Sequence, residues 1–392
     1  MHDKAGLHLG IDAINIRQGG GLTHLSQLLQ AGDPGAAGIS RVTVWTCQST
    51  AAVLPEFPWL IKKSAPWMDA ALPRRMLGQQ FQLPRALKAA CCDVLFSPGG
   101  TLPLWSTVPA VTMSQNMLPF EPLEAVLFGR LSLMRLKMRL LRYSQSRSFR
   151  RADGLIFLTQ YAEAVVSKSL GSLLCPVALI PHGIEPRFFQ PPRFQRTLAA
   201  CSKENPFSLL YVSIVMPYKH QMEVALAVSL LRSEGLPIEI RFIGEPWGSY
   251  GYQFRALLYE LDPKHEFLLW SGAELFETLH GYYHNADAFV FASSCENLPN
   301  ILIEAMAAGL PIASSDRGPM PEVLEDAGVY FDPELPASIA DAIRRLAVDV
   351  SLRSRMAELV WLKAQAYSWK RCARDTFAFI ARVAQQKGNS YV

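Results

Sequence analysis

Two carboxylates that could bind a polyhydroxylated ligand, Glu296 and Glu304, lie near the start of one predicted short helix. An ionised carboxylate can accept hydrogen bonds from two hydroxyl groups at once. The first backbone amides of the helix, which we predict from about Asn300 to Ala308, have no partner within the helix and favour an anion. A ligand that combines hydroxyl groups with an anion is a sugar nucleotide, so this stretch predicts a site for one.

Two buried strands must position these carboxylates. The apolar runs from Ala288 to Ala292 and from Leu310 to Ala313 are typical of parallel strands that are buried on both faces. The helix between them is predicted to stop at Gly309. Ligands of open α/β sheets bind beyond the carboxyl ends of the strands, which is where the connecting turn lies. The turn therefore adds four candidate donor-binding residues, namely Asn297, Leu298, Pro299 and Asn300.

Other predicted strands of the second half end at the same kind of loop. Lys219 lies between a strand predicted at Phe207 to Ser213 and a helix predicted at Met222 to Arg232, which suits a cation that binds a diphosphate. Two further strands are predicted at 238–244 and 267–270. Their exit loops are expected to line the nucleoside pocket by position alone, through Gly244, Glu245 and Ser271.

The first half also alternates strands with helices, which predicts a parallel, doubly wound α/β sheet. Strands are predicted at 7–11, 41–46, 93–96, 108–113, 153–158 and 177–180. A loop with Gly19, Gly20 and Gly21 follows the first of them, and glycines let a backbone approach a ligand closely. The alternative for this segment is a flexible surface loop.

Two neutral amides, Gln115 and Asn116, follow the strand that ends at Met113. An amide can hydrogen-bond to a sugar hydroxyl group but cannot act as a base. These side chains are therefore candidates for the acceptor or sugar side of a site. Simple loop capping is the alternative.

The segment from Arg130 to Arg151 carries eight basic side chains and no acidic one. Leu131, Met134, Met138 and Leu141 recur at helical spacing, so the segment is predicted to be an amphipathic helix with a basic face. Such a helix suits an anionic membrane surface. A solvated or phosphate-facing helix is the alternative. Nucleic acid is not expected as a partner, because no groove-reading motif appears in the sequence.

Composition limits the remaining possibilities. The 392 residues are 50% hydrophobic and 18% charged, which favours two or three globular domains. Residues 1–190 hold 19 basic and 11 acidic side chains, whereas residues 191–392 hold 19 and 23. No spanning helix or signal peptide is indicated, so we expect a cytoplasmic protein. The seven cysteines show no C-x-x-C spacing and no D-x-D pair occurs, so no metal or cofactor is expected.

The stretch from Glu296 to Glu304, with its continuation EAMAAGLPIASS and GPMPEVL, resembles the donor-binding signature of the family-four retaining glycosyltransferases, or glycosyl transferases group 1. The resemblance implies the GT-B fold, with two Rossmann-like, doubly wound α/β domains that face each other across a cleft. It implies an acceptor-binding domain at 1–185, a linker at 186–205 after a PHG segment, a donor-binding domain at 206–368 and a final helix at 369–392 that crosses back to the first domain.

The resemblance also implies roles for individual residues. Glu296 and Lys219 would be catalytic, and Glu304 would hold the donor ribose. Gly20 and Gly21 would lie across the cleft from the donor phosphates. The sequence departs from the family at two positions: Ser213 stands where an arginine is usual, and Gln115 or Asn116 stands where a histidine is usual.

The activity implied is retaining, metal-independent transfer of a hexose-type sugar from a nucleoside-diphosphate sugar to an acceptor hydroxyl group. Expected acceptors are a saccharide or a lipid-linked saccharide in lipopolysaccharide, O-antigen or other surface polysaccharide assembly. The enzyme would then lie in the cytoplasm or peripherally on the cytoplasmic face of the inner membrane. The alternatives are a sugar-nucleotide epimerase of the same fold and a catalytically silent homologue that binds sugar nucleotide.

Overall fold

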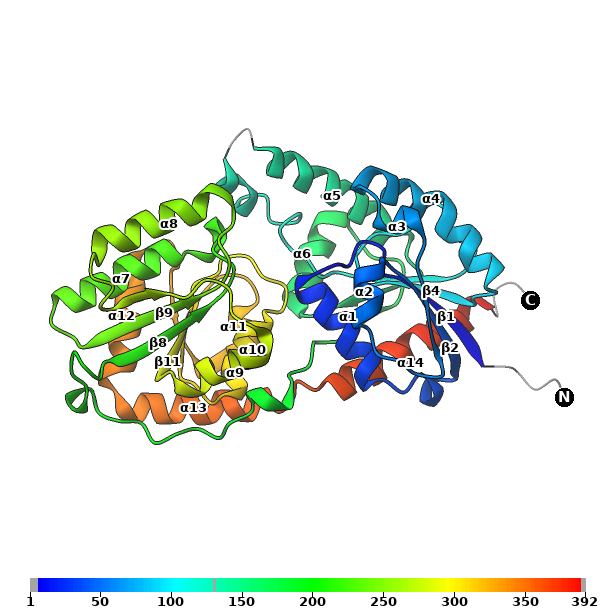
Figure 1. The fold of residues 1–392 in the computed structure, drawn as a ribbon. Helices are drawn as coiled ribbons and strands as arrows, with labels where there is room; N and C mark the ends of the chain where they lie inside the picture. Colours follow the sequence, from blue (N-terminus) through cyan, green and yellow to red (C-terminus); the bar gives the residue numbers. More distant parts are fainter. Residues whose placement is uncertain (1–5, 130–131, 389–392) are drawn as a thin grey trace. The chain divides into compact units, whose positions relative to one another are not determined.

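Two compact units make up the chain, and each is built on a parallel sheet of its own (Figure 1). The structure is a computed structural model that describes residues 6–129 and 132–388. Unit 1 comprises Met1–Phe120, Leu133–Gly183 and Ser368–Val392, and unit 2 comprises Glu121–Ser132 and Ile184–Tyr367. The predicted α/β class with two doubly wound sheets is confirmed.

Unit 1 contains a seven-stranded parallel sheet in the order β3-β2-β1-β4-β5-β6-β7. The direction of strand addition reverses between β1 and β4, so the carboxyl ends of these two neighbours flank the switch point of the sheet. Most of these strands are short, apolar and fully buried, because helices cover both faces. The strands are β1 (Leu7–Asp12), β2 (Ile39–Trp45), β3 (Leu60–Lys63), β4 (Val94–Ser97), β5 (Ala110–Met113), β6 (Gly154–Phe157) and β7 (Val177–Leu179).

The last helix of the chain belongs to unit 1, where it packs against α1 and β4. Arg130 and Leu131, the predicted start of the basic helix, lie outside the described residues, and α5 begins at Leu133. The helices of unit 1 are α1 (Gly19–Ala31), η1 (Pro34–Ala37), α2 (Gln48–Val53), α3 (Pro66–Asp69), α4 (Leu72–Ala89), α5 (Leu133–Arg151), α6 (Gln160–Leu170) and α14 (Trp369–Gly388).

Unit 2 contains a six-stranded parallel sheet in the order β10-β9-β8-β11-β12-β13. Its switch point lies between β8 and β11, which are paired through Ala288 and Leu209. The strands are β8 (Phe207–Val212), β9 (Ile238–Ile243), β10 (Leu268–Trp270), β11 (Ala288–Phe291), β12 (Ile312–Ser315) and β13 (Gly328–Phe331).

Helices cover both faces of this second sheet, and those before α12 connect its strands (Figure 1). They are α7 (Gln221–Ser233), α8 (Gly248–Leu261), α9 (Phe276–Asn285), α10 (Asn300–Ala307), α11 (Met320–Leu324), α12 (Pro336–Val348) and α13 (Val350–Ala364). The short 3₁₀ turns of unit 2 are η2 (Glu124–Phe128), η3 (Pro186–Phe188), η4 (Leu198–Ala200), η5 (Pro217–Lys219) and η6 (Glu325–Ala327). No helix in the described part of the chain has both the length and the apolarity needed to span a bilayer.

The grouping of contacts differs from the expected domain bounds in the segment 121–132. This segment falls within the first domain by sequence order, but it clusters with unit 2. Glu124 Oε2 accepts a 2.6 Å hydrogen bond from Ser294, and the ring of Phe128 packs edge-on against Trp247 at 5.0 Å. Local sequence patterns do not predict contacts between residues that lie so far apart in the chain.

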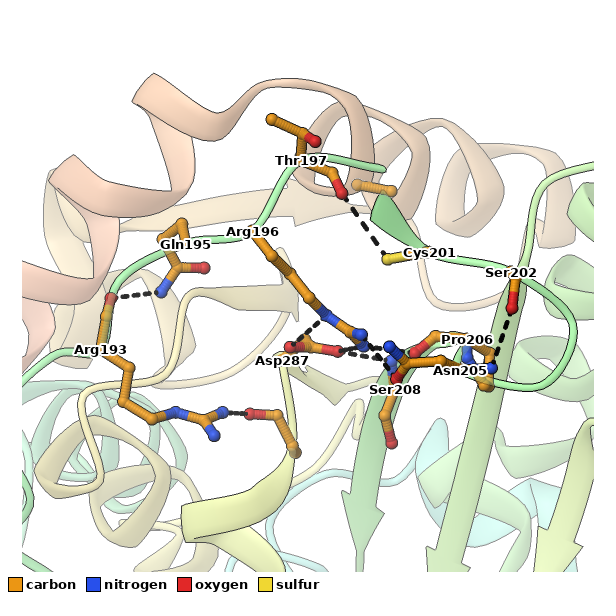
Figure 2. A network of polar contacts seen from close by, with 12 residues as sticks. Arg193, Gln195, Arg196, Thr197, Cys201, Ser202, Asn205, Pro206, Ser208 and Asp287 are labelled. Atoms are coloured by element: carbon orange, nitrogen blue, oxygen red, sulfur yellow. Dashed lines mark hydrogen bonds and ion pairs between the residues drawn. The ribbon is translucent and has the colours of Figure 1, made fainter. Parts of the chain in front are cut away.

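The segment expected to be an interdomain linker is also fixed to unit 2 (Figure 2). The Arg196 guanidinium pairs with Asp287 at 2.5 Å and donates to Asn205 at 2.8 Å. Asp287 in turn accepts from the backbone amide of Ser208 at 2.9 Å, so it joins the segment to the start of β8. The segment therefore follows the amino-terminal edge of the second sheet as part of that unit.

Candidate functional site

A buried ion pair between Lys219 and Glu296 occupies the switch point of the second sheet. Lys219 ends η5, which follows β8, and Glu296 follows β11, the strand hydrogen-bonded to β8. Lys219 Nζ donates to Glu296 Oε1, although the two residues are far apart in sequence. Lys219 is only 6% exposed. The parallel topology thus brings together two of the predicted site residues.

Opposing effects set the charge of Lys219. Burial by itself lowers the pKa of this amine, but the neighbouring Glu296 carboxylate raises it, and the net pKa is raised. The ammonium group also lies 5.1 Å from the centre of the Tyr218 ring and 5.7 Å from that of Phe291. Lys219 is therefore held as a cation in a largely desolvated place, where a charge acts strongly on a nearby anion.

Backbone contacts fix the loop that carries Lys219. The buried Tyr211 hydroxyl group donates to the carbonyl oxygen of Lys219, and the amide of Ser294 donates to the carbonyl oxygen of Tyr218 at 2.9 Å. These bonds join the exit of β8 to that of β11. The two loops are thus held in register before any ligand binds, as electrostatic catalysis requires.

A polar network next to this pair was not found by sequence reasoning. Ser294 Oγ donates to Glu124 Oε2 at 2.6 Å and lies 3.1 Å from Nε2 of His220. His220 follows Lys219 directly and has a left-handed backbone (φ +52°), which is unfavourable for a residue with a side chain. This left-handed residue next to Lys219 was not predicted, because the segment 216–221 contains neither glycine nor asparagine, the residues that most often mark such a backbone.

The turn between β11 and α10 is more buried than its polar sequence suggests. Asn297 and Leu298 are each only 6% exposed, and Pro299 is the N-cap of α10. Asn300, the first residue of α10, is half-buried, and its Oδ1 has no hydrogen-bond partner among the described residues. The start of α10 therefore holds one buried acceptor atom whose hydrogen-bonding capacity is unsatisfied within the described chain.

Glu304 is buried within α10 and bonds to a different partner from Glu296. Its Oε2 accepts a 3.1 Å hydrogen bond from the hydroxyl group of Tyr283 in α9. Burial is the main cause that raises the pKa of Glu304, to about 7, while the Tyr283 hydrogen bond acts in the opposite direction. Near neutral pH this carboxyl group is thus poised between its two protonation states.

The exits of β8 and β9 approach each other so closely that only glycine fits at position 244. A Cβ atom there would lie 1.8 Å from the carbonyl oxygen of Ser213, and Gly244 has φ +151°. The Gly244 carbonyl oxygen accepts from the Trp270 indole at 3.0 Å, while Glu245 beside it is exposed. Ser271, after β10, accepts from Arg241 at 3.1 Å. The predicted residues of these loops thus lie along one edge of the sheet.

We expect Gly244→Ala to lower the melting temperature and weaken nucleotide binding, because the added methyl group must displace the Ser213 backbone. Overpacking of this kind costs about 1–3 kcal/mol. Gly281→Ala is the matched control, since no atom lies within 4 Å of its Cβ position and the residue is within α9. Thermal unfolding of both variants checks this, and equal melting temperatures would contradict the tight approach.

In unit 1 the three glycines do not form the loop predicted for them. They are the first turn of α1, whose N-cap is Gln18, and Gly19 alone has a positive φ of +67°. Gly20 is exposed, whereas a Cβ atom at Gly21 would lie 3.2 Å from Oε1 of Gln115. The exposed Asn116 accepts from the amide of Leu118 at 3.1 Å. Gly21 and Gln115 are thus brought together at the carboxyl edge of the first sheet.

Two buried polar groups of unit 1 were also missed. Asp12, at the end of β1, accepts from Ser97 at 3.4 Å, and burial raises its pKa to about 6. His24 of α1 lies 2.9 Å from His182, nitrogen to nitrogen, and both rings pack against Trp369. Burial lowers the pKa of His24 to about 4. His182, in the PHG segment, is buried in this cluster and has a structural role in unit 1.

Metal-ligating side chains do not gather in the part of the chain that the structure describes, where no group of three or more could hold an ion. His280 and His284 have their rings 5.5 Å apart, and His284 Nε2 lies 3.2 Å from the carbonyl oxygen of Phe188. Both are residues of α9 with local packing contacts.

The family model described as Glycosyl transferases group 1 matches residues 199–359, which include Lys219, Glu296 and Glu304. A D-inositol 3-phosphate glycosyltransferase of Paenarthrobacter aurescens (strain TC1) is 23% identical over 212 residues, which are 53% of this chain and 52% of that relative. The chain thus spans about half the length of the curated relatives that it matches first. The resemblance to glycosyl transferases group 1 found in the sequence is thus confirmed for residues 199–359.

Solved structures resemble nearly the whole chain. WaaG, a glycosyltransferase involved in lipopolysaccharide biosynthesis, has a TM-score of 0.70 at 18% identity and covers 95% of this chain and 99% of its own. Anabaena HepE in complex with UDP-glucose has a TM-score of 0.68 at 14% identity, with 98% and 100% covered. At these identities the likeness shows the fold, namely the two Rossmann-like, doubly wound α/β domains that are expected for the GT-B class.

Proposed function

We propose that the chain is a retaining glycosyltransferase that uses a nucleoside-diphosphate sugar, because residues 199–359 match the glycosyl transferases group 1 family model. One observation carries the proposal, namely the buried Lys219–Glu296 pair at the switch point of unit 2, next to the start of α10. Open α/β sheets bind nucleotides at this place. The UDP-glucose complex of HepE supports a donor of this class.

In the proposed reaction, the bond between the anomeric carbon and the diphosphate breaks, and the acceptor oxygen bonds to that carbon on the same face. Lys219 and the first amides of α10 would stabilise the charge that grows on the leaving diphosphate. Glu296 would hold hydroxyl groups of the transferred sugar and favour a cationic anomeric carbon. Because Gln115 and Asn116 cannot act as bases, the departing phosphate would accept the acceptor's proton.

Glu304 would hold the donor ribose, with Tyr283 orienting its carboxyl group. Gly244, Glu245 and Ser271 would line the nucleoside pocket, because they follow β9 and β10 at the same edge of the sheet. Ser213 stands beside them without the positive charge of the usual arginine. The phosphates would therefore depend more on Lys219 and on the amides of α10 than in relatives that have both cations.

The proposed acceptor is a saccharide, in particular a lipid-linked saccharide of surface polysaccharide assembly at an anionic membrane. Two observations support this, namely the acid-free basic helix α5 and the likeness to WaaG. The chain would then work on the cytoplasmic face of the inner membrane.

Thermal unfolding in the presence of a panel of nucleoside diphosphates tests the proposal. A ligand at a hundred times its Kd stabilises the native state by about 2.7 kcal/mol, so one base should raise the melting temperature clearly above the others. Product analysis with the matching sugar nucleotide then separates the alternatives. A glycoside is expected, an isomerised sugar nucleotide would indicate an epimerase, and binding without turnover of any donor would indicate a silent homologue.

A further inference from the structure

We propose that α4, the loop around Trp105 and the outer face of α5 form one membrane-docking surface, which inserts apolar side chains into an anionic phospholipid bilayer. The surface is named here the docking face and is defined by Leu77, Phe81, Trp105, Leu133, Leu136, Leu140 and Tyr143. It deepens the proposed function, which places an acceptor at a membrane through the charge of α5 alone.

The apolar stripe predicted for α5 from the sequence is not the stripe that is exposed to solvent. Met138 is buried, and Met134 and Leu141 are half-buried, so this stripe faces the core of unit 1. Leu133, Leu136, Leu140 and Tyr143 recur at i, i+3, i+7 and i+10 on the opposite side, and each is at least 55% exposed. The helix is thus apolar on two opposite faces, and only one of them has a partner in the fold.

Helix α4 repeats this arrangement. Leu83 and Leu87 are buried against the sheet, whereas Leu77 and Phe81 are 60% and 50% exposed on the other side. Arg74, Arg85 and Lys88 continue the exposed stripe at helical spacing. Folding alone does not require large apolar residues at Leu77 and Phe81, because neither contributes to the core.

The loop between β4 and β5 joins the two helices into one surface. Gln80 of α4 accepts from the amide of Leu104 at 2.6 Å, and Arg147 and Arg151 of α5 donate to the carbonyl oxygens of Leu102 and Leu104 at 3.1 and 3.0 Å. Trp105, next in this loop, is 64% exposed. Figure 1 shows α4 and α5 as neighbours in unit 1.

The charges of this surface fit a bilayer rather than another partner. Helix α4 carries four basic residues and α5 seven, and neither helix nor the 98–109 loop carries an acid. The anionic lipid headgroups would pair with the basic side chains, and the acyl chains just below them would contact the exposed leucine and phenylalanine side chains. Exposed Trp and Tyr side chains favour the interface between headgroups and acyl chains. A nucleic acid would match the charges but would leave the apolar side chains in water.

The docking face lies toward the edge of the sheet where an acceptor is expected. Helices that connect parallel strands run antiparallel to those strands. Helices α4 and α5 therefore begin at the carboxyl edge of the sheet, where Gln115 and Gly21 also lie. Gln145 lies beside the carbonyl oxygen of Met113 at that edge, around Gly100. Leu133 lies twelve residues earlier, about 18 Å along the helix. The exposed start of α5 therefore projects beyond the edge, which would present a lipid-borne acceptor to it.

Flotation of the full chain with vesicles tests the proposal. The wild type is expected to float with phosphatidylcholine vesicles that contain phosphatidylglycerol, and only weakly with phosphatidylcholine alone. Leu77→Glu/Phe81→Glu in α4 and Leu136→Glu/Leu140→Glu in α5 should each weaken vesicle binding at least about tenfold. Lys137→Gln should weaken it about fivefold and less so at high salt. Leu362→Glu is the matched control, since Leu362 is 59% exposed on α13 of unit 2, and it should bind as the wild type does.

Full vesicle binding by the α4 variant would overturn the proposal, as would equal binding of the wild type to neutral vesicles. If the wild type self-associates, and these variants abolish self-association but keep vesicle binding, the docking face would instead bind a second copy of the chain. Nucleotide binding by each variant is measured in the same preparations. It should be unchanged, so a failure of docking is distinct from a failure of the proposed donor site.

Discussion

Lys219→Met is expected to lower kcat by about 10² to 10³, measured as transfer or as hydrolysis of the matching sugar nucleotide. The methionine keeps the length and apolar stem of the side chain but removes the cation that would meet the leaving diphosphate. KM for the donor should rise less than kcat falls, because the charge on the phosphate grows as the bond breaks.

The same variant should destabilise the protein, because it leaves the Glu296 carboxylate without its cation. Removing one partner of a buried ion pair costs about 3–5 kcal/mol. The double variant Lys219→Met/Glu296→Gln should recover much of this stability without recovering activity. Recovery of full turnover in the double variant would remove both residues from the reaction, whereas Glu296→Gln alone should lower kcat.

Glu304→Ala is the second change with a large expected effect, and it should raise the donor KM about 10- to 100-fold with a smaller change in kcat. Hydrogen bonds to a charged group contribute about 1.5–3 kcal/mol each, and the ribose would donate to this carboxylate. Glu304→Gln is the conservative comparison, because it keeps the shape and one acceptor oxygen. Unchanged donor affinity in the alanine variant would show that the ribose binds elsewhere.

The pH dependence of donor binding follows from the same residue. The pKa of Glu304 is raised to about 7 by burial, so its neutral form dominates below that pH in the free protein. Ribose hydroxyl groups favour the carboxylate, so donor affinity should weaken as pH falls below 7, toward tenfold per unit. A sugar nucleotide suits the titration, because its diphosphate is a diester of constant charge over this range. Glu304→Gln should flatten the profile, and an identical slope in that variant would assign the pH dependence to another group.

Strongly patterned elements could be predicted from the sequence. The strand, turn and helix from Ala288 to Ala307 were predicted to within a residue or two, because an apolar run, a proline and a glycine mark their ends. Elements such as β3, α11 and β13 were missed, since each is short and mixes buried residues with more exposed ones, so no continuous apolar run marks it. The three glycines that start α1 were predicted as a loop, because consecutive glycines are poor helix formers.

The site could be predicted only where local sequence determines it. The exit loops of β8 and β11 were identified separately, and the parallel topology brings Lys219 to Glu296. Contacts made across the fold left no local signal. Examples are the hydrogen bond from Tyr283 to Glu304 and that from Ser294 to Glu124, 170 residues apart. The docking face was also missed, since the sequence pattern of α5 shows an apolar stripe without showing which stripe the core uses.

Hydrogen exchange of the backbone amides, with and without the nucleoside diphosphate chosen from the thermal panel, tests the central claim most directly. If the Lys219–Glu296 pair and the start of α10 bind the diphosphate, the segments 213–221 and 293–302 should both gain protection, and Lys219→Met should abolish the gain in both. Protection confined to other segments, or unchanged protection in the variant, would contradict the proposed donor site.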